Sequence, residues 1–365
     1  MYKKIFMGIA AVAALTLVSC SSDDLNSLSD NSSKNEAISF DGYLGRSAVA
    51  VNGSRGSVLE IGDLQNSKEG FGVFGYYNST DGQVFGSNLF NNEKVYCSST
   101  KPAKWTYDNT KYWPTEGHID FLAYAPYVQG MKLTNNTTTN TTSCIKFDVA
   151  KEVANQKDLL WAKADGQTKE ENSGANKVKF QFAHALSRLG YTVKLSEKCS
   201  SVATITLKNV TLAGSDPTTG STTESTTEST GAFYTNGTID LATGKWSSPS
   251  GNQDFNWFSA ETAGTQPVTF TSTSAETYKS TDYLFVIPQN FKVGNENKLY
   301  VIVEYTIRYS DVTNPFTYKV YKQLEWDFLQ GKAYTINLTL GLTPIEFDAD
   351  VTAWKDTDQK DVHWN

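Results

Sequence analysis

Residues 177–182 read KVKFQF, and this alternation of polar and apolar side chains decides the fold class. Val178, Phe180 and Phe182 point to one face of an extended chain, whereas the lysines and the glutamine point to the other. A period of two residues is typical of a strand that is buried on one face only. The segment therefore predicts a β-strand with an apolar core beneath it.

The same alternation recurs toward the C-terminus in residues 299–309, 334–340 and 345–351. Residues 283–287, YLFVI, are apolar throughout, which is typical of a central strand that is buried on both faces. Helical periodicity is limited to one short candidate, residues 183–189, between two predicted strands. Many short strands separated by Asn-Gly and Asp-Gly turns predict an all-β chain of two tandem β-sandwich domains with mainly antiparallel strands.

Chain length supports two domains. Residues 38–365 together exceed what one hydrophobic core usually supports. We expect an N-terminal sandwich over residues 38–185 and a C-terminal sandwich with a polar tail over residues 186–365.

One low-complexity segment, residues 218–230, reads TTGSTTESTTEST and has no apolar side chain. Such a segment cannot form a core strand, and we expect a solvated hairpin loop, with a linker as the alternative. The loop predicts that residues 203–212 and 232–241, on either side of it, pair within one sheet.

The N-terminal segment 1–24, MYKKIFMGIAAVAALTLVSCSSDD, has the order of a bacterial lipoprotein signal. Two lysines precede an apolar run over positions 5–18, which leads into a lipobox, Leu-Val-Ser-Cys20. This run is shorter than the about 20 residues that a transmembrane helix needs. We predict a signal peptide over residues 1–19 and a lipid, with palmitate among its acyl chains, on Cys20.

Residues 20–37 are predicted to form a flexible tether, because they are mostly polar. The acidic residues directly after Cys20 resemble the surface-export signal of Bacteroidetes lipoproteins, which implies a location on the outer face of the outer membrane. Without Lys3 and Lys4, 30 Lys and Arg face 39 Asp and Glu, a net charge of −9. A nucleic-acid partner is excluded, because it would require a basic face.

Catalytic and metal-binding motifs are lacking in the sequence. None of His118, His184 and His363 has a second histidine three or four residues away, and no nucleophile elbow or phosphate-binding loop occurs. An EF-hand that begins at Asp348 fails, because Ala353 and Gln359 stand at its glycine and glutamate positions. We therefore expect no enzyme activity, no metal and no cofactor, although a carboxylate pair for glycoside hydrolysis could still form in the fold.

Three cysteines, Cys97, Cys144 and Cys199, follow the lipobox at wide spacing. One disulfide with one free thiol and three buried free thiols are both compatible with this pattern.

A family resemblance rests on the order of several motifs. Residues 104–127, KWTYDNTKYWPTEGHIDFLAYAPY, resemble a recurrent segment of the fimbrillin-like proteins of Bacteroidetes, the subunits of type V pili. The sequences DLLWA at residues 158–162 and VKFQFAHALSRL at 178–189 resemble the next landmarks of that family, and residues 334–354 resemble its closing strands. The resemblance implies a fimbrial subunit that supports cell adhesion and binds other fimbrial subunits and a receptor on a host or bacterial surface.

The resemblance also implies a mode of assembly. In this family an arginine-specific protease cuts a lipid-anchored precursor, its first strand leaves, and an extended segment of the next subunit enters the vacated groove. Here the displaced strand corresponds to residues 38–44, with Ile38, Phe40 and Tyr43 expected to face the groove. Arg46 and Arg55 are the candidate cleavage sites, since both lie among small residues.

The donated segment implied by the resemblance is residues 345–351, whose alternating apolar side chains are those of Ile345, Phe347, Ala349 and Val351. The same segment could instead be an integral strand of the C-terminal sandwich, so stalk, tip and anchor roles all stay open. A surface glycan-binding lipoprotein of a polysaccharide-uptake system is the main alternative. Its sugar platform would use exposed aromatic side chains, with three candidates: Trp246, Trp257 and Trp326.

Overall fold

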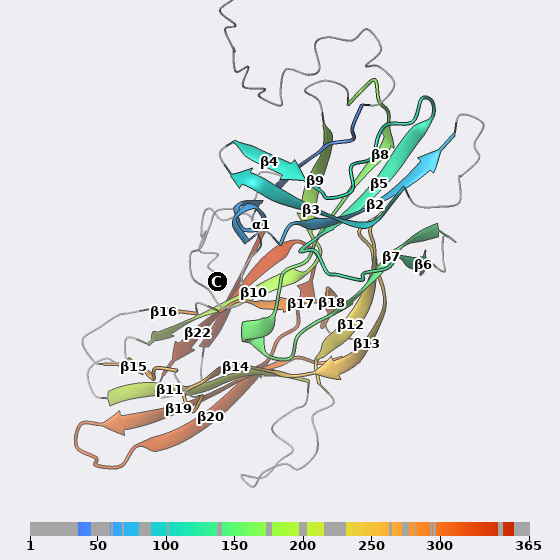
Figure 1. Ribbon diagram of the computed structural model, residues 1–365. Coiled ribbons are helices and arrows are strands. Elements are labelled where there is room, and N and C mark those ends of the chain that lie inside the picture. Colours follow the sequence, from blue (N-terminus) through green and yellow to red (C-terminus); the bar gives the residue numbers. More distant parts are fainter. Residues whose placement is uncertain are drawn as a thin grey trace, which may run out of the picture.

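The computed structural model shows an elongated molecule built almost entirely of β-strands (Figure 1). The structure describes residues 36–44, 59, 61–67, 69–79, 89–100, 102–136, 141–172, 177–196, 203–214, 231–262, 265–271, 277–280, 282–292, 294, 297–341 and, for the backbone, 346–353. The all-β fold class predicted from the sequence is confirmed.

A seven-stranded sheet forms the N-terminal part of the molecule. In spatial order its strands are β1 (Phe40–Leu44), β9 (Val178–His184), β8 (Leu160–Gln167), β5 (His118–Ala125), β2 (Phe71–Asn78), β3 (Phe90–Thr100) and β4 (Ala103–Thr106). β1 runs parallel to β9, whereas the other neighbours are antiparallel. Side chains of β9 alternate between buried and exposed, as the sequence KVKFQF predicts.

The α-helix α1 (Ile61–Ser67) lies beside β3 and was not expected from the sequence, and a short 3-10 helix, η2 (Val153–Asn155), lies between β7 and β8. Leu64 is fully buried, and Ile61 packs against the same core. Seven residues make only two turns, which is too short for an apolar stripe of helical period to be recognised.

Three sheets and one short strand pair form the C-terminal part. The first has β10 (Ser187–Leu195) between β22 (Lys332–Leu340), which pairs with β23 (Glu346–Ala353), and the short strands β16 (Tyr278–Lys279) and β17 (Leu284–Val286). The second has β14 (Phe255–Ser259), β11 (Ala203–Ala213), β19 (Tyr300–Tyr309) and β20 (Phe316–Gln323), with β15 (Val268–Phe270) beside β11. The third has β13 (Trp246–Gln253), β12 (Phe233–Asp240), β7 (Thr141–Asp148) and β6 (Thr134–Asn136). The strand pair consists of β18 (Gln289–Asn290) and β21 (Asp327–Phe328).

One local prediction is wrong, and the single helix candidate is not a helix. The strands on either side of residues 218–230 do not pair, because β11 pairs with β14, β15 and β19 while β12 joins β7 and β13. Residues 183–189 form no helix, since β9 continues to His184 and β10 begins at Ser187. Ala185 and Leu186, the two residues between the strands, are fully buried at the change of direction.

Residues 283–287 are buried as predicted, but β17 pairs on one side with β10 only. On the other side the Phe285 N–H donates to the side-chain Oε1 of Gln156, at 2.7 Å. Gln156 is itself buried and donates from Nε2 to the Ala150 carbonyl. A glutamine side chain thus takes the place of a neighbouring strand at this point.

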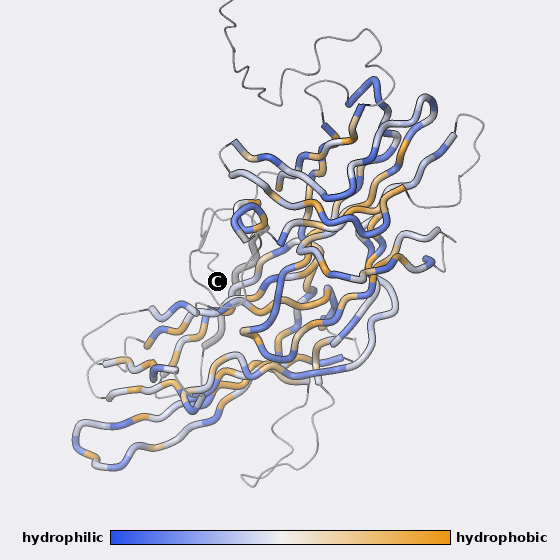
Figure 2. Tube along the Cα trace, in the orientation of Figure 1, coloured by the Kyte–Doolittle hydropathy of each residue, from blue (hydrophilic) through white to orange (hydrophobic). Residues whose placement is uncertain are grey.

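The two faces of the seven-stranded sheet pack against different cores. Phe71 and Val73 of β2 belong to the core enclosed by this sheet, whereas Phe74 of the same strand belongs to the C-terminal core. The hydropathy colouring shows apolar residues concentrated along the inside of both parts (Figure 2). β6 and β7 precede the boundary predicted at residue 185 and pair with β12, so the division into domains stays a prediction.

Candidate assembly site at the N-terminal strand

The candidate displaced strand lies at one edge of the seven-stranded sheet. β1 pairs with β9 from Phe40 opposite Val178 to Leu44 opposite Phe182. The residues just before β1 bind another part of the same domain, since the Ile38 N–H donates to the Lys111 carbonyl at 2.8 Å. Residues 36–44 therefore contact both β9 and the segment around Lys111.

Phe40 is the centre of this site and is 1% exposed. Its ring lies among four aromatic rings at centroid distances of 5.3 to 5.7 Å: Phe90, Phe121, Tyr107 and Phe180. Edge-to-face and stacked aromatic pairs of this kind each contribute about 0.5–1.5 kcal/mol beyond the burial of area. The Phe40 side chain thus fills a pocket made by four aromatic side chains from other segments of the chain.

Tyr107 connects this pocket to the backbone of the displaced segment. Its hydroxyl donates to the Ile38 carbonyl at 2.7 Å, and the Lys111 N–H donates to the same hydroxyl at 3.2 Å. Burial raises the pKa of Tyr107 above its ordinary value. The phenol therefore stays neutral and keeps its proton available as a hydrogen-bond donor to Ile38.

Of the three residues expected to face the groove, Ile38 and Phe40 are buried, whereas Tyr43 is 43% exposed. The orientation expected for Tyr43 is therefore wrong. Gly42 takes the inward place next to Phe40, because alternate residues of a strand share a face. A Cβ atom at position 42 would lie 3.3 Å from the Phe182 ring and 3.4 Å from the Phe71 ring.

The candidate donor segment lies at the edge of a different sheet. β23 pairs antiparallel with β22, from Glu346 opposite Thr339 to Ala353 opposite Lys332. Phe347, Ala349 and Val351 belong to this strand. Other predicted positions lie outside the described residues: Cys20, Arg46, Arg55, Cys199, Ile345 and the segment 218–230. Cys97 and Cys144 are buried free thiols.

The histidines for which the structure gives contacts have structural surroundings. His184 Nδ1 lies 2.7 Å from the buried Asp158 carboxylate, which also accepts the backbone N–H of Leu159 at 2.8 Å and of Leu59 at 3.4 Å. Asp158 thus ties Leu59, just before α1, to β8 and β9. Within the described part of the chain, no cluster of three metal-binding side chains occurs.

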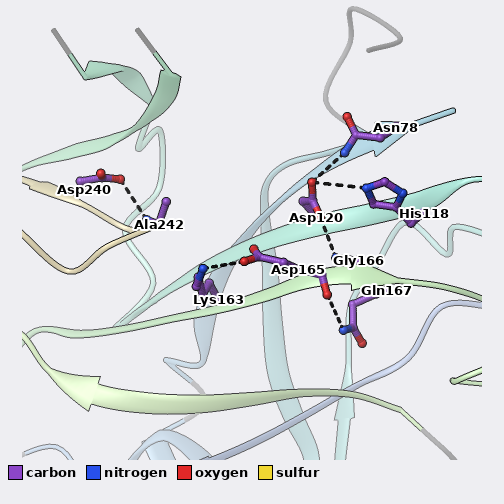
Figure 3. A network of polar contacts seen from close by, with 9 residues as sticks. All are labelled: Asn78, His118, Asp120, Lys163, Asp165, Gly166, Gln167, Asp240 and Ala242. Carbon is purple, nitrogen blue, oxygen red and sulfur yellow. Dashed lines mark hydrogen bonds and ion pairs between the residues drawn. The ribbon is translucent and has the colours of Figure 1, made fainter. Parts of the chain in front are cut away.

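His118 belongs to a polar network at the ends of three neighbouring strands (Figure 3). Asp120 of β5 accepts hydrogen bonds from the Asn78 side chain of β2 at 2.7 Å and from the Gly166 N–H of β8 at 2.6 Å. His118 Nε2 lies 3.7 Å from the same carboxylate. The contacts of Asp120 fasten strand ends to one another, which is a structural role.

The tryptophans considered as a sugar platform are packed into the fold. Trp257 is buried and donates from Nε1 to the Asp282 carbonyl. Trp246 donates from Nε1 to the Ala185 carbonyl at 2.7 Å, and Trp326 packs against Phe328 and Tyr334. Trp257 is therefore unavailable to a sugar, whereas Trp246 and Trp326 are half-buried and packed against the core.

The sequence reasoning did not assign the pocket around Phe40. Tyr107 and Phe121 lie in the motif at residues 104–127, on which the family resemblance partly rests. A signal was present, since this motif concentrates aromatic residues between two short strands. The motif does not indicate that Phe40, from a strand distant in the sequence, packs among these aromatic side chains.

Comparisons with known proteins agree with this architecture. The sequence pattern of the fimbrillin-like family matches residues 60–354. No curated protein matches the sequence. Among solved structures, a fimbrial protein from Bacteroides vulgatus is 21% identical with a TM-score of 0.63, and the alignment covers 88% of this chain and all of that one.

Two further solved structures are more distant in shape. A proposed cell adhesion protein from Bacteroides ovatus is 14% identical with a TM-score of 0.48, over 89% of this chain and 99% of that one. The tip fimbrial protein Mfa3 from Porphyromonas gingivalis, with a C-terminal truncation, is 10% identical with a TM-score of 0.36, over 78% of this chain and 93% of that one. The match to the family pattern extends over most of the sequence, and the chain belongs to the fimbrillin-like family.

Proposed function

We propose that the protein is a fimbrial subunit that is exported as a lipoprotein, anchored through Cys20 to the outer membrane at the cell surface, and assembled by strand exchange after proteolysis. Membership of the fimbrillin-like family supports the fimbrial role. The lipobox sequence supports the lipid anchor. Among the described residues no helix is long and apolar enough to span a membrane.

The observation that carries the exchange step is the attachment of β1. This strand of five residues pairs with one strand, β9, and places Phe40 in a pocket made by other segments. Loss of β1 would expose the β9 edge and the Phe40 pocket together. An unpaired strand edge with an adjacent apolar pocket is the kind of site at which an extended peptide adds to a sheet.

Arg46 and Arg55 are the proposed cleavage sites, because both follow β1 and precede α1 in the sequence. A cut at either position would separate residues 36–44 from the rest of the chain. An arginine-specific protease is thus a proposed partner, together with other fimbrial subunits. A receptor on a host or bacterial surface is the proposed target of adhesion, which a stalk, tip or anchor subunit would each support.

The proposal is tested on the precursor from Ser21 to Asn365, treated briefly with an arginine-specific protease and run without boiling on an SDS gel. A cut that yields a detergent-resistant ladder supports exchange, provided that Arg46→Ala combined with Arg55→Ala abolishes it. A clean cut with no ladder from this chain alone contradicts self-assembly and assigns a tip or anchor role. Resistance at both arginines contradicts protease-triggered assembly altogether.

A further inference from the structure

The edge strand β20 concentrates exposed aromatic side chains. In the part of the chain that the structure describes, eight large apolar or aromatic side chains are exposed, and four of them lie within residues 312–321: Val312, Phe316, Tyr318 and Tyr321. The hairpin of β19 and β20 lies at the end of the molecule away from the seven-stranded sheet (Figure 1). Aromatic side chains that gather on an exposed surface are typical of a contact with another protein.

The backbone of β20 is also available to a further strand. Among the described residues β20 pairs with β19 alone and forms the end of its sheet. This pairing runs without a bulge from Tyr300 opposite Gln323 to Ile307 opposite Phe316. Because β20 contains no proline, every second residue directs an N–H and a carbonyl away from β19. Such an edge can add a strand from another chain.

The sequence of β20 is complementary to itself when it is read in the opposite direction. β20 reads FTYKVYKQ, in which a Tyr-Lys pair precedes Val320 and another follows it. When two copies pair antiparallel about Val320, Tyr318 lies opposite Lys322 of the second copy, and Lys319 lies opposite Tyr321 of the second copy. The two members of each pair lie on the same face of the joined sheet, because they are equally far from Val320 along the strand.

From this pattern we propose that β20 binds a second copy of the chain, with the two β20 strands antiparallel about a twofold axis at Val320. Each tyrosine–lysine pair brings a cation close to an aromatic ring, which is a favourable contact. The same surface serves both copies, as a twofold dimer requires. The contact goes beyond the assembly proposed above, because it joins subunits side by side and needs neither strand exchange nor proteolysis.

The tyrosine rings are held in place before a partner binds. Tyr318 stacks on Tyr305 of β19 with ring centroids 5.8 Å apart, and Tyr321 packs edge-on against Tyr300 at 6.4 Å. Both rings are still more than a third exposed. Each ring therefore leaves surface for a lysine of the second copy, and ordering it on binding costs little side-chain entropy.

Other registers are less favourable. A register centred on Lys319 sets that residue opposite Lys319 of the second copy, and like charges directly opposite each other destabilise a strand pair. A register centred on Tyr321 sets Lys322 opposite the aliphatic Val320. A shift by one residue sets the core face of one strand beside the outer face of the other. Only the register centred on Val320 sets every lysine of β20 opposite a tyrosine.

Disulfide cross-linking tests this register in the uncleaved precursor, Ser21 to Asn365, with Cys199→Ser in every variant. Val320→Cys is expected to form a covalent dimer on oxidation, because residue 320 faces itself across the twofold axis. A mixture of Thr317→Cys chains and Gln323→Cys chains is also expected to form a dimer, since these two positions lie opposite each other. One of the two pairs is hydrogen-bonded and the other is not, so one of them has the close Cβ spacing that a disulfide needs.

The matched controls are Thr317→Cys alone and Gln323→Cys alone, which are expected to remain monomeric on a gel run without reductant. The native Cys97 and Cys144 are buried and do not interfere. A dimer from either control overturns the register. Absence of a covalent dimer in every variant overturns the contact itself. Neither outcome affects the strand exchange proposed above, because the chains are not cleaved.

A lysine substitution tests the contact without cysteines. Lys319→Ala is expected to raise the dissociation constant of the dimer about 5- to 30-fold in sedimentation velocity, because the dimer loses two cation–aromatic contacts. Arg308→Ala, which removes an exposed cation from β19 beyond its pairing with β20, is the matched control and is expected to change the constant less than about twofold. Lysines on an edge strand can also keep other strands away. Tighter association of Lys319→Ala would assign that role to Lys319 and overturn the proposal.

Discussion

Two edge strands of the molecule, β1 and β20, differ in what their side chains do. β20 has eight residues paired with β19, yet Phe316 is 50% exposed and Tyr318 is 39% exposed. β1 has five residues, and its Phe40 is 1% exposed within a ring of aromatic groups. The comparison teaches that the length of an edge strand does not decide how deeply its side chains are buried, because the shorter strand buries its phenylalanine completely and the longer one does not.

The largest effect is expected from removing the Phe40 side chain, which would abolish the difference in burial between β1 and β20. Phe40→Ala is predicted to lower the free energy of unfolding of the N-terminal part by about 3–5 kcal/mol, because it leaves a cavity among four aromatic rings. Phe316→Ala in β20 is the matched control and is predicted to cost about 1 kcal/mol, since half of its surface is already exposed. Denaturant unfolding of both variants measures the difference, and equal losses would contradict it.

A smaller effect is expected from Tyr107→Phe. The substitution removes the hydroxyl that donates to the Ile38 carbonyl, so the free energy of unfolding is predicted to fall by about 1–2 kcal/mol. The same loss should make β1 easier to displace, which is measured as faster ladder formation after proteolysis. A variant that unfolds and assembles like the original chain would show that this hydrogen bond does not retain β1.

The pH dependence of Tyr107 provides a weaker effect. Burial raises its pKa in the folded state above the ordinary value of 10.0. Above about pH 10 the unfolded chain therefore releases this proton before the folded chain does. The stability that comes from keeping the phenol neutral is complete below that pH and is lost as the pH rises through the folded-state pKa. Tyr107→Phe should flatten the fall in stability above about pH 10, as measured by urea unfolding, and an unchanged slope would contradict this.

The smallest effect is expected at Gly42. Gly42→Ala is predicted to change stability by less than about 1 kcal/mol, because the lost backbone entropy of the unfolded chain offsets the small movement of Phe182. Gly72→Ala in β2 is the contrasting variant, since its Cβ atom would lie 2.3 Å from the Tyr124 ring and it should destabilise the protein clearly. Thermal unfolding of the two variants distinguishes a groove that accepts alanine from a strand that does not.

Local patterns allowed many strands to be predicted. The alternation at residues 177–182 and 334–340 corresponds to β9 and β22, whose side chains alternate in burial as expected. The prediction failed where neighbours are set by distant parts of the chain, as for β11 and β12, which the sequence placed in one sheet and the structure places in two. Helix α1 was missed because its seven residues carry too little periodicity.

The candidate site shows the same division. The burial of Ile38 and Phe40 follows from the alternation of residues 38–44, but the expected orientation of Tyr43 breaks that alternation and is wrong. The four rings around Phe40 belong to segments that are distant from it in the sequence, and the most distant is that of Phe180 in β9. No local pattern therefore identifies them. Their role depends on which strand inserts between them.

The sequence by itself determined the all-β class, the lipobox and the family motifs, because each depends on residues that are close together in the chain. Only the tertiary structure decided that β1 runs parallel to β9, that Phe40 fills an aromatic pocket and that Gly42 faces Phe182. The physical reason is that strand pairing joins segments across long loops, and many pairings satisfy the same backbone hydrogen bonds. Shape complementarity among side chains that are distant in sequence then selects one of them.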